Sequence, residues 1–345
     1  MDYFLPLFLF VCAVITVLWW FSALDLVGGW TGVLAFLAVF FGLRFDHLRR
    51  QKERIRAQHE ETVAWVQNEI TIAYNGISDP SGNIFVSYCK LFELTATAEE
   101  EKLAAFNQEL KRLQSGRRAS GLRMPDLLKK LDIDMTYNSN AIEGNPITLN
   151  ETTLILAGFV AGRRKSLRHV NDIVGHSAAF KQVQKMAVSG TEMSMEQVLR
   201  VHKLVSWNSE DGGVFRSEGE VAMVGGTKVL FAMPDETEAL VKRLLAWISL
   251  KRDQNMHPFL LAVNFHYIFV RIHPFRDGNG RTARLLSNLI LMQHGYPPII
   301  VRVRKKEQYM ASLRKWNTGD SQPFASHMAE LLHESFNLYF SVLKI

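Results

Sequence analysis

Groups able to accept a proton, hold a metal ion and bind phosphate lie close together between Arg271 and Arg284. His273 is a candidate general base, because an imidazole titrates near neutrality and can deprotonate a hydroxyl. Asp277 offers the hard carboxylate oxygens that Mg²⁺ prefers. Arg281 and Arg284 add guanidinium groups that fit phosphate oxygens. Each feature alone has an ordinary structural explanation, but their clustering within fourteen consecutive positions points to chemistry on a bound phosphate.

The surrounding pattern predicts a glycine-rich loop between two helices. Phe259–Ile272 is apolar at helical spacing, and the proline after His273 ends that helix. Gly278 and Gly280 permit unusual backbone angles and close approach of a ligand. A second apolar run, Leu285–Met292, is predicted to be the next helix. We therefore expect loop N–H groups and the positive end of the second helix to face one anion.

The stretch His273-Pro-Phe-Arg-Asp-Gly-Asn-Gly-Arg-Thr-Ala-Arg284 resembles the signature of the Fic family, H-x-F-x-D/E-G-N-G-R-x-x-R, at every defined position. Most of that family transfers AMP from ATP to a protein hydroxyl, so the resemblance implies a nucleotidyltransferase that uses ATP and Mg²⁺. It implies that His273 is the catalytic base, that Asp277 places the metal and that Arg284 holds the γ-phosphate. The α- and β-phosphates would be held by Gly278, Asn279, Gly280 and Arg281. Some Fic-like proteins move phosphate or phosphocholine instead, but Arg284 favours a full triphosphate.

A second stretch, Ser139-x-x-x-Glu143-Gly144, predicts a helix that ends at a left-handed glycine. It also resembles the inhibitory S/T-x-x-x-E-G/N motif of Fic proteins, in the class that carries it before the catalytic core. The resemblance implies a bidentate pair between Glu143 and Arg284 that excludes the γ-phosphate. We therefore expect an autoinhibited protein adenylyltransferase.

Two short β-prone runs around Gly225-Gly226 predict a hairpin. This segment resembles the flap of Fic domains, which pairs with the backbone of the target protein. The resemblance assigns target binding to four consecutive residues: Val221, Ala222, Met223 and Val224.

Four other polar residues are ambiguous. Asn171 matches an asparagine of the family and is predicted to make a structural hydrogen bond. His202 is interpreted as a packed or capping histidine and not a ligand. Tyr309 and Asn317 would line a nucleotide pocket or serve the core and a helix end. The resemblance as a whole extends from about Ser139 to Phe324.

The N-terminal part predicts a membrane anchor. Tyr3–Leu24 and Val27–Leu43 are apolar, and a basic cluster, Arg44–Arg56, follows at once. The positive-inside rule keeps that cluster in the cytoplasm, which favours a bacterial inner-membrane protein with its catalytic domain facing the cytoplasm. One long tilted span is an alternative to two spans. A signal peptide is disfavoured, because no basic region precedes the apolar run and no small-residue cleavage site follows it.

The predicted fold class is all-α, a Fic-type helical bundle with one β-hairpin flap, preceded by a transmembrane hairpin. Residues 1–45 would anchor the chain, 46–120 would form a helical stalk or N-terminal helical region, and 121–345 would hold the inhibitory helix and the catalytic domain. The net charge of +6 is concentrated beside the apolar segment, so we interpret it as topological and expect no nucleic-acid partner. Two cysteines predict neither a disulfide framework nor a zinc cluster.

The expected partners are ATP, a protein substrate, the membrane and, as one option, a second copy of the chain. Two alternative functions stay open. Glu143 would position a water that removes AMP from a modified target, or the chain would be a non-catalytic, membrane-anchored, nucleotide-binding scaffold.

Overall fold

The computed structural model describes residues 49–50, 53, 100–117, 124–159, 166–218, 221–224, 227–317 and 320–345. Contacts within the chain define two units, Met1–Ser78 and Asp79–Ile345. In the first unit, the described residues are helical, and Arg49 pairs with Glu53 one turn later. The two predicted apolar spans lie outside the described residues. None of the helices that are described has the length and apolar character to span a bilayer.

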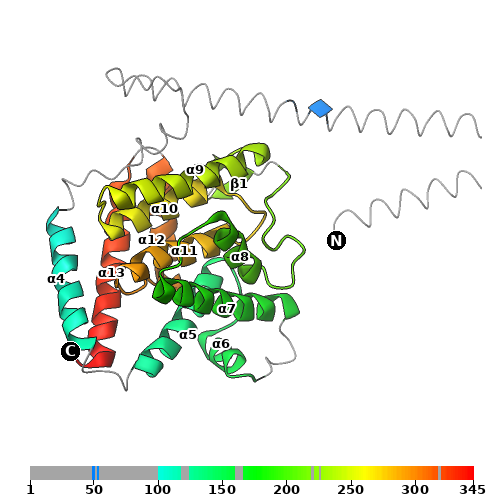
Figure 1. Cartoon of the computed structure of the whole chain (residues 1–345). Coiled ribbons are helices and arrows are strands. Elements are labelled where there is room, and N and C mark those ends of the chain that lie inside the picture. The colour runs from blue at the N-terminus through cyan, green and yellow to red at the C-terminus, as the bar shows by residue number, and fades with distance from the viewer. Residues whose placement is uncertain are drawn as a thin grey trace, which may run out of the picture. The chain divides into compact units, whose positions relative to one another are not determined.

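The second unit is a helical bundle with a single described hairpin (Figure 1). Its helices are α4 (Glu100–Arg117), α5 (Met124–Ile142), α6 (Leu149–Leu156), α7 (Leu167–Ser189), α8 (Met195–Val205), α9 (Pro234–Asp253), α10 (Pro258–Ile272), α11 (Asn279–Gln293), the 3₁₀ turn η3 (Val303–Lys305), α12 (Lys306–Asn317) and α13 (Gln322–Leu343). Strands β1 (Val221–Val224) and β2 (Thr227–Leu230) pair antiparallel, with Val221 opposite Leu230. The predicted helical bundle with one hairpin is therefore present in the described part.

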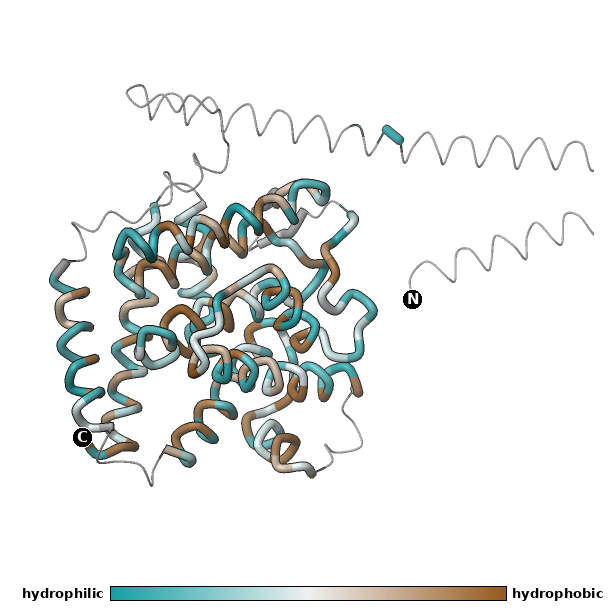
Figure 2. The backbone as a smooth tube through the Cα atoms, viewed as in Figure 1, coloured by the Kyte–Doolittle hydropathy of each residue, from teal (hydrophilic) through white to brown (hydrophobic). Residues whose placement is uncertain are grey.

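The centre of the bundle is the pair α10 and α11. Almost every side chain of α10 is buried, including Phe265 and Phe269, whose rings stack 5.5 Å apart. A helix that is apolar all round belongs in a protein interior, and α10 is brown along most of its length in Figure 2. Helices α7, α8 and α5 pack against α11, and α9 packs against α10. The loop between the two central helices, which carries the signature, is thus held from several sides.

Helix α4 packs along the C-terminal helix α13, as Figure 1 shows. Arg112 donates to the carbonyl of Ile345 at 2.8 Å, and its guanidinium lies over the Phe340 ring. Contacts within the chain group α4 with the unit Asp79–Ile345. The predicted division of residues 46–120 from residues 121–345 stays a prediction. The predicted boundaries near residues 45 and 120 themselves fall outside the described residues.

The second signature helix begins earlier than predicted, at Asn279 and not at Leu285. Gly278 precedes it with φ +80°, a left-handed conformation that favours glycine. The Asn279 side chain closes the loop, accepting from the N–H of Phe275 at 2.9 Å and donating to its carbonyl at 2.6 Å. This cap depends on a side chain reaching back four residues, which the apolar pattern does not reveal. Gly280 and both signature arginines are therefore helical.

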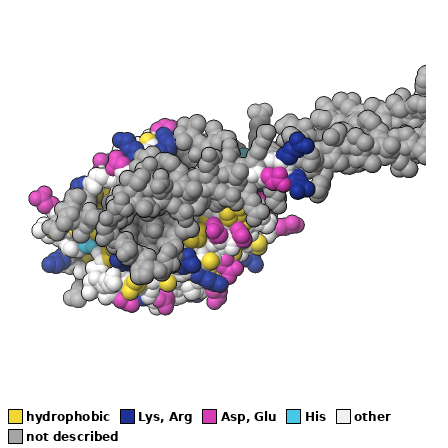
Figure 3. Space-filling model, turned by 90° about the horizontal axis from the view of Figure 1, so that it is seen from above, with side chains coloured by type: hydrophobic (Ala, Val, Ile, Leu, Met, Phe, Trp, Pro, Cys, Tyr) yellow, Lys and Arg dark blue, Asp and Glu magenta, His cyan; other side chains and the backbone are white. Residues whose placement is uncertain are grey.

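Charged side chains of both signs are interspersed on the face of the molecule seen in Figure 3. Among the described residues in that view, lysines and arginines alternate with aspartates and glutamates and do not form a continuous basic stripe.

Candidate active site

His273 ends α10 in a left-handed conformation, with φ 51° and ψ 57°. Such a backbone is uncommon for a residue with a side chain, and here it turns the imidazole out of the helix. Nδ1 lies 3.3 Å from the carbonyl of Val270, and the ring stacks on Phe231 at 3.8 Å. If Nδ1 carries the proton that this carbonyl accepts, the basic lone pair is on Nε2.

The expectation that His273 titrates near neutrality is wrong. Burial lowers its pKa to about 4, against the opposing effect of the Val270 carbonyl, and the charge of Arg216 lowers it further. Glu143 and Asp277 act in the opposite direction but do not restore the usual pKa. The imidazole is therefore neutral at pH 7, the protonation state that a general base needs, although it is a weaker base than a solvated histidine.

His202 packs against the signature loop, which confirms its interpretation as a packed histidine. Its Nδ1 accepts from the N–H of Gly213 at 2.9 Å, so Nε2 carries the proton and donates to the carbonyl of Asp277 at 2.9 Å. The ring also stacks face to face on Phe275 at 3.6 Å. Burial lowers the pKa of His202 to about 4, which keeps this tautomer neutral.

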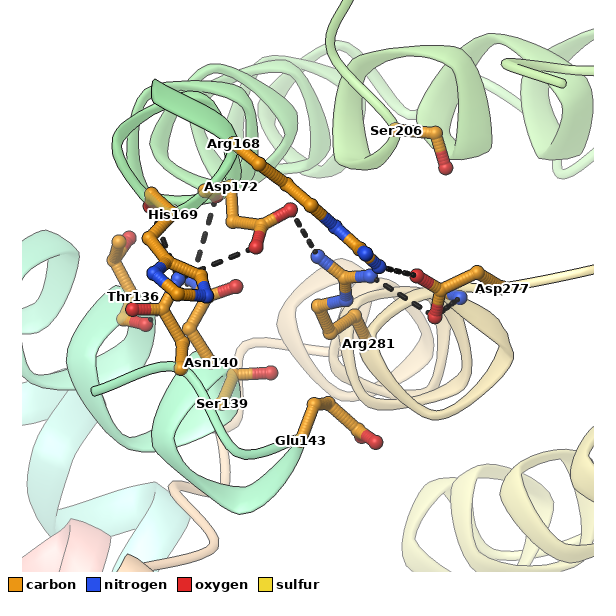
Figure 4. Close-up of polar contacts among 12 residues, drawn as sticks. Thr136, Ser139, Asn140, Glu143, Arg168, His169, Asp172, Ser206, Asp277 and Arg281 are labelled. Carbon is orange, nitrogen blue, oxygen red and sulfur yellow. Dashed lines mark hydrogen bonds and ion pairs between the residues drawn. The ribbon is translucent and has the colours of Figure 1, made fainter. Parts of the chain in front are cut away.

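Asp277 pairs with two arginines, Arg168 and Arg281, as Figure 4 shows. Arg281 Nη2 is 3.2 Å from Oδ1, and Arg168 Nη2 is 3.3 Å from Oδ2. The N–H of Gly278 donates to Oδ1 at 2.6 Å. Burial acts to raise the pKa of Asp277, but Arg281, the Gly278 amide and Arg168 outweigh it and lower the pKa. The carboxylate is therefore ionised at pH 7, and its side chain is 60% exposed.

A second carboxylate, Asp172 on α7, holds Arg281 from the opposite side (Figure 4). Its Oδ1 is 3.0 Å from Arg281 Nη1, and its Oδ2 accepts from Asn145 at 3.2 Å. Asn145 also donates to the carbonyl of His169 and lies two residues after Glu143, so it ties the end of α5 to α7. Sequence reasoning missed Arg168, Asp172 and Asn145. The only local signal was the position of Asn145 directly after the Glu143-Gly144 pair.

Arg284 contacts the end of α5. Its Nη2 is 2.6 Å from Glu143 Oε1, as the resemblance predicted. The contact is not the bidentate pair that we expected, because Nε donates to Ser139 Oγ at 2.9 Å and Nη2 also donates to the Ser139 carbonyl at 3.0 Å. Burial opposes the charge of Arg284, but Glu143 and then Tyr309 raise its pKa above the ordinary value. Arg284 is buried, whereas the Glu143 side chain is 39% exposed.

Two glycines make this contact possible. Gly144 follows α5 with φ +92°, which confirms the predicted left-handed end of the helix. A Cβ on Gly280 would lie 2.6 Å from Glu143 Oε1 and 3.1 Å from Arg284 Nη1. Gly280 is helical, so the site needs its small size and not a special backbone angle.

The remaining predicted residues are Tyr309, Asn317, Asn171 and Val221–Val224. Tyr309 is buried, and its hydroxyl lies 2.7 Å from His266 Nε2, so it serves the core beside Arg284. The side chain of Asn317 lies outside the described residues, and the structural role of Asn171 stays a prediction. The main chain of Val221–Val224 forms β1, and its role in target binding stays a prediction as well.

Comparisons with known proteins agree with this geometry. The model of the Fic/DOC family matches residues 192–291, which include the whole signature. The chain is 31% identical over 265 residues to a protein adenylyltransferase Fic of Drosophila grimshawi, covering 76% of this chain and 54% of the relative. It is 35% identical over 205 residues to its namesake in Drosophila ananassae, covering 59% of this chain and 40% of that one. The chain therefore carries a domain of the Fic/DOC family. It spans about half the length of the curated relatives that it matches.

Solved structures share the fold. A Fic domain containing signaling protein from Bacteroides thetaiotaomicron aligns with a TM-score of 0.63 and 25% identity, covering 68% of this chain and 97% of that chain. A fragment of Fic-1 from C. elegans aligns with a TM-score of 0.61 and 28% identity, covering 84% of this chain and 86% of that chain. The described bundle is a Fic-like helical fold.

Proposed function

We propose that the chain is a protein adenylyltransferase that transfers AMP from ATP to a hydroxyl of a target protein and is restrained by Glu143. The observation that supports this most strongly is the contact between Glu143 and Arg284, at 2.6 Å, beside the loop that carries His273 and Asp277. The relatives named protein adenylyltransferase Fic support the same reaction.

In the proposed reaction, Nε2 of His273 takes the proton from a Ser, Thr or Tyr hydroxyl of the target. The hydroxyl oxygen attacks the α-phosphorus of ATP, and the bond from that phosphorus to the bridging oxygen breaks as pyrophosphate leaves. Arg281 and the N-terminal N–H groups of α11 would neutralise the phosphates that this helix end faces. The protein's contribution is mainly positioning and charge stabilisation.

The chemistry of Asp277 fits a Mg²⁺ ion. Its carboxylate is ionised and exposed. No cluster of three or more His, Cys, Asp or Glu side chains among the described residues would hold a metal without help. Mg²⁺ usually binds one or two carboxylates together with substrate phosphates and water, so one aspartate is enough when ATP is present. When bound, the ion would neutralise charge on the phosphates.

Restraint by Glu143 follows from competition for one guanidinium. A γ-phosphate and a carboxylate both seek Nη2 of Arg284, whose Nε is already bound by Ser139. Charge-assisted hydrogen bonds are the stronger kind, so the carboxylate would be displaced only at a cost. The exposed fraction of Glu143 leaves it room to swing away, while the buried arginine stays in place.

The hairpin β1–β2 is the proposed holder of the target. In the described part it is a two-stranded sheet, so the outer edge of a strand is available to an added strand of the target. This mode fixes an extended segment without reading much of its sequence. We further propose that residues 1–45 anchor the protein in a bacterial inner membrane with the Fic domain in the cytoplasm. A homodimer stays a prediction.

The reaction is tested by incubating Glu143→Gly with radiolabelled ATP and Mg²⁺ and analysing the product by mass spectrometry. Glu143→Gly should carry covalently bound AMP on a hydroxyl, and Glu143→Gly/His273→Ala should carry none. The double variant should still bind the nucleotide but transfer no AMP. Equal labelling of the two proteins would contradict the role of His273. A scaffold without turnover predicts no label on either protein.

The reverse reaction, removal of AMP, is a second candidate. It is favoured by one observation: the Glu143 carboxylate is 39% exposed, so a solvent water could reach it. A target first modified by Glu143→Gly and then incubated with the wild type tests this. Loss of AMP with the wild type alone supports removal, and stable AMP rejects it.

A further inference from the structure

Arg216 joins separate stretches of main chain around the proposed base. Its Nε donates to the carbonyl of His273 at 2.6 Å. Its terminal nitrogens donate to the carbonyl of Glu218 at 3.0 Å and to that of Ala232. Glu218 precedes β1 and Ala232 follows β2, so one buried guanidinium holds both ends of the hairpin against the end of α10.

A main-chain contact and an aromatic ring reinforce this link. The N–H of Arg216 donates to the carbonyl of Pro274 at 3.0 Å. Phe231 follows β2 directly, is 7% exposed and stacks on the His273 imidazole at 3.8 Å with an interplanar angle of 13°. The chain thus passes directly from the end of β2 to Phe231, whose ring packs against the imidazole. A displacement of the hairpin would be passed to the base through this ring.

We propose that Arg216 and Phe231 are positioning residues that set the His273 imidazole relative to the hairpin β1–β2. A hydroxyl presented along the hairpin then meets Nε2 at the distance that proton transfer needs. This inference rests on the proposed function, because it takes the hairpin as the holder of the target. It adds that the hairpin, which would bind the target, and the His273 imidazole keep a fixed position relative to each other. Binding of the target would therefore also place its hydroxyl for deprotonation.

The residue types suit this role. A guanidinium is a planar fork with five N–H donors, so it reaches several carbonyls in different directions at once. Lysine concentrates its donors at one point and would serve one or two of these carbonyls. Proximity effects are steep, and a misplacement of about 1 Å costs on the order of 100-fold in rate. Small losses of alignment would therefore appear in the transfer rate before they appear in nucleotide binding.

The test uses the full chain carrying Glu143→Gly, with Arg216→Lys added. We expect its ATP dissociation constant, measured by calorimetry, to stay within about twofold, while the automodification rate at saturating ATP falls about 10- to 100-fold. Amide hydrogen exchange should rise in peptides covering residues 221–224 and 273–278. The matched control is Arg243→Lys, an exposed arginine on α9, which should change none of these quantities.

Phe231→Leu provides a second variant that keeps the Arg216 contacts and removes the stacked ring, and it should lower the rate at unchanged ATP affinity. An unchanged rate in both variants would overturn the proposal, as would a loss of ATP affinity equal to the loss of rate. If the parent Glu143→Gly transfers no AMP, the proposed function fails. Hydrogen exchange then still decides the link, since unchanged exchange at 273–278 in Arg216→Lys would reject it.

Discussion

Glu143 Oε1 lies 2.6 Å from Nη2 of Arg284, and Gly280 leaves the space for that oxygen. The two residues are separated by 141 positions, and they meet because α5 and α11 pack together. The helix end that would bind a nucleotide is therefore paired with a carboxylate of its own chain. Arg281, one turn earlier, is paired with Asp172 in the same way.

Gly278→Ala should lower the free energy of unfolding by more than the strain of a left-handed backbone alone would. Gly278 has φ +80°, and an added Cβ would lie 3.1 Å from Val205 Cγ1 and 3.3 Å from His202 Nε2. Gly158→Ala is the matched control, because Gly158 has φ +87° and open space around its Cβ position. Left-handed strain costs about 1–2 kcal/mol in both. Urea unfolding should show a larger loss for Gly278→Ala, and equal losses would argue against close packing of His202 under the loop.

The pH dependence of AMP transfer reports the state of His273. Because burial lowers its pKa to about 4, the neutral base persists through mildly acidic solution. For Glu143→Gly, kcat/KM should show no loss on the acid side between about pH 8 and pH 5, and should fall only near pH 4. A half-maximal point near the ordinary histidine value of about 6.5 would mean that the imidazole is solvated.

The free energy of unfolding should also fall as the pH is lowered, and His202 is one cause. Its pKa is about 4 in the folded chain, so between its unfolded value and about pH 4 the unfolded chain binds the extra proton. The contribution of neutral His202 to the free energy of unfolding is full above about pH 6.5. It is lost as the pH falls toward 4, at about 1.4 kcal/mol per pH unit. His202→Gln should be less stable at pH 7.5 and should show a shallower loss in urea unfolding between pH 7 and pH 5. Parallel curves for the two proteins would contradict this.

Arg168 should compete with a metal ion for Asp277. The pair between them is exposed, and such pairs contribute at most about 1 kcal/mol. Arg168→Met should therefore lower the Mg²⁺ concentration for half-maximal ATP binding by at most about fivefold. Arg276→Met removes the same charge one residue from Asp277, where the arginine instead pairs with Asp211. An equal effect of both variants would indicate a general loss of positive charge and not a specific competition.

The sequence predicted the parts of the site that are local, and less of the parts that depend on packing. The apolar run through α10, the proline after His273 and the left-handed Gly144 are readable from residue type and spacing. The beginning of α11 at Asn279 was missed, because the cap is a side chain bonded to Phe275. The pair Arg281–Asp172 joins residues 109 positions apart and leaves no local signal.

The pKa of His273 was also mispredicted, for a physical reason. From sequence alone a histidine is given the pKa of a solvated imidazole, whereas the pKa of His273 in the folded chain depends on burial and on Arg216, which comes from another segment. The resemblance to the Fic signature predicts the base and the phosphate loop, and the second motif predicts the inhibitory partner. Neither identifies the residues that hold them, among them His202 and Arg216.

The competition between Glu143 and a γ-phosphate is tested most directly by comparing ATP with ADP. ADP lacks the γ-phosphate, so it has no group that must displace Glu143 from Arg284. Calorimetric titration of the wild type and Glu143→Ala in the presence of Mg²⁺ should show ATP binding about 10- to 100-fold tighter in the variant, the range expected for one charge-assisted hydrogen bond. ADP binding should change by less than about twofold. An equal gain for both nucleotides, or a gain for neither, would contradict the account.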